Sequence, residues 1–266
     1  MAVAAEPLLA TEDLCKSFGG VRALDGVSFS LAAGELMGLI GPNGSGKTTA
    51  FNLITGVLKP TSGAIRFRGV PVGGNPPEKN AFLGMARTFQ NIRLFRDLPV
   101  IDNVMVGVHM RHGPGFLASI LQLPSARGAE RAIRRRAMDV LDVLGLTRRA
   151  GERVGSLPYG DQRKVELARA LASEPSLLLL DEPTAGMNPH ETADLGTTIR
   201  HLHDTLGITT LLVEHDMKMV MRLCDRIVVV NQGKVLSAGT PQSVQADPRV
   251  IEAYLGRRRR PADALA

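Results

Sequence analysis

The stretch LMGLIGPNGSGKTT (36–49) places an apolar segment directly before a glycine-rich turn and a helix-forming segment. Within it, Gly41, Gly46, Lys47 and Thr48 have the G-x-x-x-x-G-K-[ST] spacing. Glycines let the backbone curl until successive N–H groups point inward, and the following helix adds the positive end of its dipole. The pattern therefore predicts a loop that binds phosphate groups. Its residues are Gly41, Pro42, Asn43, Gly44, Ser45, Gly46, Lys47, Thr48 and Thr49.

Acidic residues that could complete such a site follow another apolar segment. The sequence LLLLDEP (177–183) predicts a buried strand that ends at Asp181 and is followed by Glu182. Two consecutive acids there are costly to desolvate unless a cation or a reacting water uses them, although an acidic pair could merely cap the strand. We assign Lys47 to the β- and γ-phosphates, and Thr48 and Asp181 to Mg²⁺. Glu182 is assigned to orienting or deprotonating the attacking water.

The rest of the chain predicts a mixed α/β fold. Helical patterns occupy residues 91–156, after which strand and helix patterns alternate, including a helix from Pro189 to about Leu206. This alternation is typical of an open, mostly parallel sheet with crossover helices. The longest helix of the middle region, at about 128–144, is expected to carry arginines on one face. Its apolar face is predicted to contain Ala132, Met138, Leu141 and Leu144.

Composition excludes several classes of protein. The 266 residues have ordinary apolar (44%) and charged (22%) fractions, while Trp is absent and aromatic residues make up 4%, which argues against base stacking as the main mode of action. Cys15 and Cys224 are too few for a disulfide framework and lack the spacing of a metal site. No apolar run approaches the roughly 18 residues needed to cross a bilayer, and a basic leader is missing. We expect a chain that is neither inserted nor secreted by itself.

Much of the net charge of +6 is concentrated in arginine clusters. The clusters are Arg131 with Arg134, Arg135 and Arg136, then Arg148 with Arg149, and finally Arg257 to Arg260. Such clusters can bind nucleic acid or anionic lipid, but a solvated helix face and a disordered tail explain them more simply.

Six motifs in a fixed order resemble the ATP-binding subunits of ABC transporters: SFGG, GPNGSGKTT, TFQN, YGDQR, LLLLDEP and VEHD. The resemblance covers nearly the whole chain. It implies a P-loop NTPase fold with a mostly parallel central sheet, an N-terminal antiparallel β subdomain and an inserted helical subdomain. The implied single domain spans residues 6–256. It comprises a core (6–90 and 166–240), a helical insertion (91–165) and a C-terminal segment (241–256), with a basic tail at 257–266.

The resemblance also implies roles for individual residues. Phe18 would stack on the adenine of ATP, Gln90 would reach the magnesium and the attacking water, and His215 would contact the γ-phosphate. In such proteins two ATPase subunits dock head to tail, and the signature segment of each completes the phosphate site of the other. Here that segment would contribute Tyr159, Gly160 and Asp161 in trans.

The signature segment departs from the family's L-S-G-G-Q pattern. It reads Leu157 to Asp161, with Pro158 in place of the usual serine, so a hydroxyl and a backbone N–H are both missing. The helix that follows is expected to begin with a basic first turn, a feature that favours a nearby anion. In the next interface segment, Asn188 stands where aspartate is usual. With Pro189 and Glu191 it predicts a helix N-cap of the capping-box type.

A narrower resemblance is to the larger ATPase subunit of high-affinity branched-chain amino acid importers. It depends on TFQNIRLFRDLPVIDNV (88–104), the helical insertion, YGDQR and GTPQSVQADPRVIEAYLG (239–256). The implied partners are two polytopic membrane permease subunits, a second ATPase subunit and, indirectly, a substrate-binding protein. The implied location is peripheral, on the cytoplasmic face of the inner membrane. An ATPase of a lipid or lipopolysaccharide exporter, or an ABC ATPase that acts on nucleic acid, is the alternative, although no nucleic acid partner is expected.

Overall fold

The computed structural model describes residues 6–112 and 124–255. It divides into two compact units: unit 1 joins the described residues up to Asn75 with those from Leu211 onward, and unit 2 runs from Pro76 to Thr210. The tail cluster Arg257 to Arg260 lies outside the described residues. No helix among the described residues is long and apolar enough to cross a membrane.

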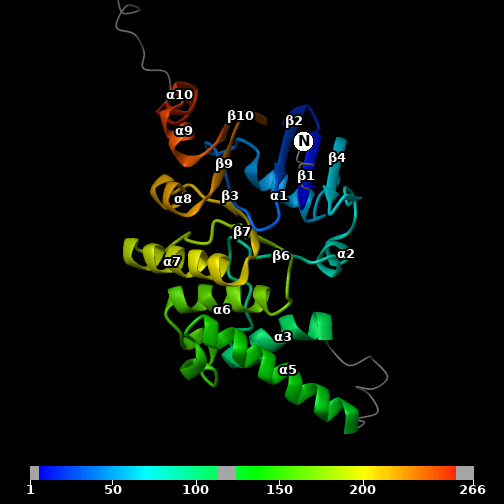
Figure 1. Cartoon of the computed structure of the whole chain (residues 1–266), viewed down its shortest axis with the longest axis vertical. Coiled ribbons are helices and arrows are strands. Elements are labelled where there is room, and N and C mark those ends of the chain that lie inside the picture. The colour runs from blue at the N-terminus through cyan, green and yellow to red at the C-terminus, as the bar shows by residue number, and fades with distance from the viewer. Residues whose placement is uncertain (1–5, 113–123, 256–266) are drawn as a thin grey trace, which may run out of the picture. The chain divides into compact units, whose positions relative to one another are not determined.

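Unit 1 contains two groups of strands with short helices (Figure 1). Its elements are β1 (Leu9–Phe18), β2 (Val21–Leu31), β3 (Leu36–Ile40), α1 (Lys47–Ile54), β4 (Ser62–Phe67), β5 (Val70–Pro71), β8 (Thr209–Val213, which begins at the boundary), α8 (Met217–Leu223), β9 (Arg226–Asn231), β10 (Lys234–Gly239), α9 (Pro241–Ala246) and α10 (Pro248–Leu255). The order β2-β1-β4-β5 forms an antiparallel sheet, as expected for the start of the chain. The order of the other strands is β10-β9-β3-β8, in which β3 pairs parallel with β9 and β10 pairs antiparallel with β9.

The strand β3 delivers the glycine-rich loop. All five of its residues are buried, which matches an apolar segment covered on both faces. Its parallel neighbour β9 has an apolar centre, with Ile227 to Val230 fully buried. A rigid, two-sided core therefore fixes the point at which the loop begins.

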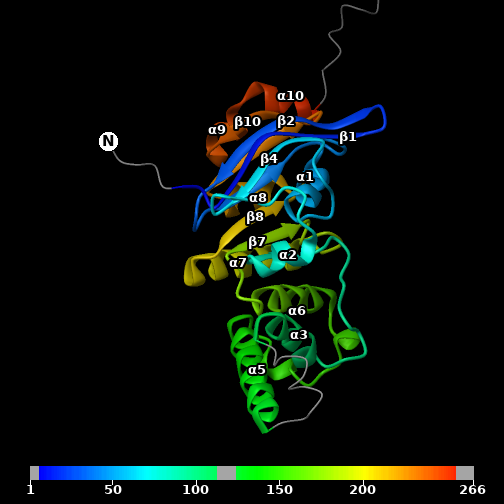
Figure 2. The same ribbon diagram turned by 90° about the vertical axis from the view of Figure 1, so that its right-hand side faces the viewer.

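Unit 2 is mainly helical. Its elements are α2 (Pro77–Phe82), β6 (Met85–Arg87), α3 (Val100–His112), α5 (Pro124–Val143), two short 3₁₀ turns (Thr147–Arg149 and Val154–Ser156), α6 (Tyr159–Leu171), β7 (Leu177–Asp181) and α7 (Pro189–Leu206). The strands β6 and β7 pair in parallel, and the bounds of α7 agree with the predicted helix. Figures 1 and 2 both show α3, α5 and α6 packed side by side.

The predicted apolar face of α5 was partly wrong. Ala132 is exposed and Met138 is only half-buried, whereas Ile133 and Ala137 are buried together with Leu141. These three residues follow one another at intervals of four, so they form the stripe that packs on α3, and Leu144 lies just beyond the helix end. Arg131, Arg134, Arg135 and Arg136 are exposed, in agreement with a solvated basic face.

Candidate functional site

The phosphate loop in unit 1 has the backbone that its glycines predict. Gly41 leaves no room for a side chain, because a Cβ there would lie 1.9 Å from the carbonyl oxygen of Val230. Gly46 adopts a φ of +109°, and a Cβ there would lie 2.7 Å from the carbonyl oxygen of Ala23. The loop is therefore fixed by close backbone packing, and residues with side chains cannot replace these two glycines without a shift of the strands.

The polar groups of this loop fit a bound anion. Lys47 is buried, and its Nζ donates to the carbonyl oxygens of Gly41 (2.7 Å) and Pro42 (3.0 Å). The hydroxyl of Ser45 is buried and has no hydrogen-bond partner within the described residues. The helix α1 has no side-chain cap and no acidic residue in its first turn. An ammonium group, an unpartnered hydroxyl and an uncapped helix N-terminus together suit phosphate oxygens.

Two other predicted site residues lie in unit 1. Phe18 ends β1 with 47% of its surface exposed, and the Nζ of Lys16 lies 5.1 Å from its ring centroid. An exposed ring of this kind is available for stacking on a base. His215 follows β8, and its side chain is largely exposed. Its backbone N–H donates to Oε2 of Glu214, a fully buried carboxylate that sequence analysis did not single out.

The predicted acidic pair lies in unit 2, at the end of β7. Asp181 is buried, and its Oδ2 lies 2.6 Å from Nη2 of Arg87, a residue of the neighbouring strand β6. Glu182 has a φ of +47°, in the left-handed region that a residue with a side chain rarely adopts. The left-handed backbone at Glu182 therefore follows directly on the end of the strand at Asp181.

Gln90 and Glu182 meet in the structure. Nε2 of Gln90 donates to Oε2 of Glu182 over 2.9 Å, although the two residues are 92 positions apart in the chain. Sequence analysis placed both near the reacting water, and the structure brings their side chains together. The loop that carries Gln90 is also held by Arg163 of α6, which sequence analysis missed. A buried arginine that serves backbone carbonyls has no sequence signal that separates it from a surface arginine.

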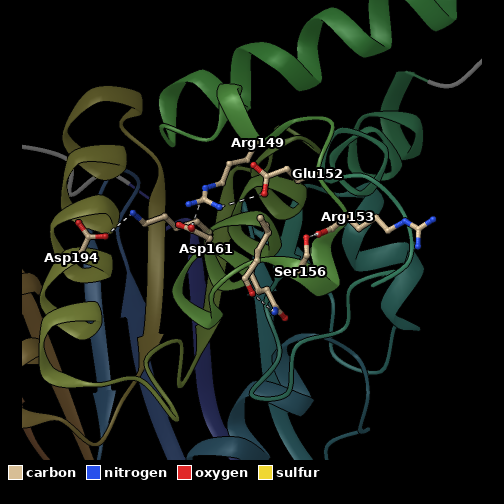
Figure 3. Close-up of polar contacts among 9 residues, drawn as sticks. Arg149, Glu152, Arg153, Ser156, Asp161 and Asp194 are labelled. Carbon is tan, nitrogen blue, oxygen red and sulfur yellow. Dashed lines mark hydrogen bonds and ion pairs between the residues drawn. The ribbon is translucent and has the colours of Figure 1, made fainter.

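The signature segment forms the first turn of α6. Pro158 is the N-cap residue and provides no side-chain cap, so the backbone donors of the first turn remain available for an anion. The expected basic first turn was wrong: it contains Asp161, while Arg163 and Lys164 follow in the second turn. Asp161 pairs with Arg149 over 3.3 Å, as Figure 3 shows.

The N-terminus of α7 has the predicted capping box. Oδ1 of Asn188 accepts hydrogen bonds from the backbone N–H groups of His190 and Glu191, each over 3.0 Å. Oε2 of Glu191 accepts from the backbone N–H of Asn188 in return. The helix tips of α6 and α7 line one cleft, which includes Gly160, Asp161, His190, Glu191 and Asp194. Lys164 also lines this cleft and pairs with Asp194 over 2.6 Å.

Comparison with known proteins shows which family this chain resembles. Residues 24–185 match the family model described as ABC transporter, and residues 234–259 match the model described as branched-chain amino acid ATP-binding cassette transporter. The chain is 45% identical to the high-affinity branched-chain amino acid transport ATP-binding protein LivG of Escherichia coli K12, over 94% of this chain and 98% of that protein. It is 44% identical to the corresponding protein BraF of Pseudomonas aeruginosa, over 94% and 98% of the two chains.

Solved structures show the same fold. The ADP conformation of an ATP-binding cassette from an ABC transporter superimposes with a TM-score of 0.82 and 32% identity, and it covers 95% of this chain and 100% of that chain. A nucleotide-free cassette gives a TM-score of 0.81 at 32% identity, over 94% and 100%. The predicted α/β P-loop fold is therefore confirmed. The chain belongs to the ABC transporter family, as an ATP-binding subunit of the branched-chain amino acid type.

Proposed function

We propose that this chain binds ATP with Mg²⁺ and hydrolyses it to power the import of branched-chain amino acids. The observation that carries the hydrolytic role is the hydrogen bond from Gln90 to Glu182 at the end of β7. A carboxylate that accepts a hydrogen bond from a neutral amide at the end of a buried strand is held in one orientation, which a general base for water requires. The names of the two relatives support the choice of substrate.

In this proposal the phosphate loop holds the triphosphate. The backbone N–H groups of the loop from Asn43 to Thr49 would surround the β-phosphate, and Lys47 would exchange the loop carbonyls for phosphate oxygens. His215 stabilises the γ-phosphate, and Phe18 stacks on the adenine. Transfer of a phosphoryl group to water requires positioning and charge neutralisation more than covalent catalysis, which suits this set of residues.

Thr48, Asp181 and Gln90 would hold the magnesium ion. They offer a hydroxyl, a carboxylate and an amide oxygen, which are hard ligands of the kind Mg²⁺ prefers. The described residues contain no cluster of three or more His, Cys, Asp or Glu side chains that could hold a metal. This fits an ion that takes one carboxylate from the protein and other ligands from phosphates and water. When bound, Mg²⁺ supplies charge neutralisation at the phosphates.

A second ATPase subunit would complete the site. Tyr159, Gly160 and Asp161 begin α6, whose uncapped N-terminus presents backbone donors to the γ-phosphate of the opposite subunit. ATP then favours the closed pair, because only that state lets one γ-phosphate contact both subunits. Hydrolysis removes this bridge, and the pair reopens. Two membrane permease subunits would convert the motion into transport, with the ATPase pair peripheral to the cytoplasmic face of the inner membrane.

Replacement of Glu182 by glutamine tests the proposal. E182Q should lower ATP turnover about 10²- to 10⁴-fold, because the amide cannot accept the proton of the attacking water. Its affinity for ATP should change less than about twofold, since the carboxylate acts on water and not on the nucleotide. Turnover by the complex with its permease subunits and equilibrium ATP binding measure the two effects.

The exposed Glu78 in the first turn of α2 provides the matched control, E78Q, which removes one carboxylate in the same way. Full turnover in E182Q would remove Glu182 from the mechanism. Uptake of leucine, isoleucine and valine by vesicles that contain the whole transporter tests the substrate class. Co-purification with lipid-exporting permeases, or salt-sensitive binding to nucleic acid, would contradict it.

A further inference from the structure

Tyr159 occupies a signature position where the family pattern has glycine, and its side chain contacts the same chain. Its hydroxyl donates to the carbonyl oxygen of Ala185 over 3.0 Å, in the loop that follows Glu182. The phenol also lies against Gly186, where a Cβ would be 3.6 Å from the hydroxyl oxygen. The side chain thus bridges the first turn of α6 and the loop between β7 and α7.

Arg163 extends this bridge to the loop that carries Gln90. Its Nη2 donates to the hydroxyl oxygen of Tyr159 over 2.9 Å, and its guanidinium carbon lies 5.3 Å from the tyrosine ring centroid. The same guanidinium donates to the carbonyl oxygens of Phe89, over 3.0 Å, and of Gln90. Tyr159 therefore accepts one hydrogen bond from the arginine and donates one to the carbonyl oxygen of Ala185.

The burial of Arg163 makes these contacts difficult to exchange. The residue is 3% exposed, and Oε2 of Glu166, which is 2% exposed, lies 3.1 Å from its Nη1. Its Nε has no hydrogen-bond partner among the described residues, so the loss of a further acceptor would leave a second desolvated donor unsatisfied. Neighbouring charges on α6 pair elsewhere: Asp161 with Arg149, and Lys164 with Asp194 (Figure 3). These outer pairs leave the inner contacts of Tyr159 undisturbed.

The contacts close into a ring around the proposed general base. From Tyr159 the path runs to Arg163, then to the backbone of Gln90, then from the side chain of Gln90 to Glu182. The chain continues from Glu182 to Ala185, whose carbonyl returns to Tyr159. Both flanks of Glu182 are thus tied to the first two turns of α6. A shift of that turn cannot occur without strain on the position of the carboxylate.

We propose that Tyr159 is a positioning residue, which couples the signature turn of this chain to the chain's own Glu182. The proposal rests on the function proposed above, in which that turn meets the nucleotide of the opposite subunit. When the nucleotide of the opposite subunit binds this turn, the contacts would hold Glu182 in position to act as the base. Nucleotide binding at one site would then affect hydrolysis at the other. Tyr159 would act through backbone and side-chain contacts within its own chain.

Replacement of Tyr159 by phenylalanine removes the hydroxyl and keeps the ring. In Y159F, backbone amide exchange at Ala185 to Met187 should become about 3- to 10-fold faster, the effect of one lost hydrogen bond on local opening. In the complex with permease subunits, kcat should fall by a similar factor, while the KM for ATP changes less than about twofold. The control is T197V, which also removes one hydroxyl from unit 2. That hydroxyl donates only within its own helix, to the carbonyl oxygen of Ala193.

Each outcome decides the proposal. Faster exchange together with lower kcat and unchanged KM supports it. Unchanged exchange in Y159F, or faster exchange with unchanged kcat, would overturn it. A raised KM with unchanged exchange would show that the phenol touches nucleotide, which also overturns it. If the wild-type complex did not hydrolyse ATP, the proposed function would fail, and the exchange measurement alone would still decide whether the hydroxyl ties the two segments together.

Discussion

Among single residues, Tyr254 shows how the C-terminal segment reaches the phosphate loop. It lies in α10, and its hydroxyl accepts a hydrogen bond from the backbone N–H of Gly41. Burial raises the pKa of the Tyr254 phenol to about 12, and the hydrogen bond from Gly41 opposes part of that rise. The segment that matches the branched-chain amino acid family model therefore touches the first residue of the nucleotide loop.

The raised pKa of Tyr254 predicts a titration that can be observed alone. The chain has two tyrosines, so Y159F leaves Tyr254 as the single one. At a pH of about 11, where an ordinary tyrosine with a pKa of about 10 is mostly ionised, folded Y159F should still show little tyrosinate absorbance. Because the fold favours the neutral phenol, its contribution to stability is fully present below pH of about 10 and is lost as the pH rises toward 12. Half-ionisation near pH ~10 in the folded protein would show that this side chain, which is 36% exposed, lacks the raised pKa.

Among the secondary-structure elements, the contact of α3 with α6 is set by a glycine. A Cβ at Gly107 would lie 2.1 Å from the carbonyl oxygen of Arg169 and 3.0 Å from the Cβ of Ala172. The backbones of the two helices therefore approach as closely as they do only because this side chain is absent. The helix α6 begins with the signature turn, so this contact also helps to fix the position of that turn.

Replacement of Gly107 by alanine should separate α3 from α6. We expect G107A to lower the free energy of unfolding by about 3 kcal/mol, because the clash is with backbone and cannot be relieved by a side-chain rotation. G128A is the matched control: it makes the same change in α5, at an exposed site where a Cβ meets nothing within 4 Å. That control should leave stability unchanged or raise it by up to about 1 kcal/mol, because alanine favours helix. Urea unfolding measures both, and equal stabilities would refute the close-packing argument.

For the whole molecule, the proposed catalytic unit is a pair of ATPase subunits. In the proposed closed state the uncapped tip of α6 meets the γ-phosphate held by the other subunit, so that one γ-phosphate contacts both subunits. Activity should therefore depend on association. The membrane subunits would raise the local concentration of the two ATPases, so hydrolysis should be fastest in the assembled transporter.

Dilution of the isolated chain tests this dependence. Turnover per chain should fall as the protein is diluted from a concentration at which pairs form to one at which sedimentation shows single chains. In the dilute limit it should be about 10²-fold or more below that of the assembled transporter, because the signature donors to the γ-phosphate are missing. If single chains hydrolysed ATP as fast as the transporter, the requirement for a second subunit would be wrong.

The sequence alone determined the features that depend on neighbouring residues. The glycine and lysine spacing of residues 41–49 predicted the phosphate loop, and LLLLDEP predicted a buried strand that ends in Asp181. The pattern at Asn188 and Glu191 predicted a capping box, which the structure confirms. Backbone conformation, caps and burial over a few residues follow from local chemistry, so a motif carries them wherever it occurs.

The tertiary structure alone decided which distant side chains meet. Arg87 and Asp181 are in contact although 94 positions separate them in the sequence, and Gln90 and Glu182 although 92 positions do. No spacing rule identifies Arg163 as the buried partner of a loop in another part of the chain, or points Tyr159 toward its own chain. The apolar face of α5 was misjudged for a related reason, since small errors in phase decide between Ala132 and Ile133. The direction of a side chain depends on the packing of whole elements, and that packing is a property of the fold and not of any short segment.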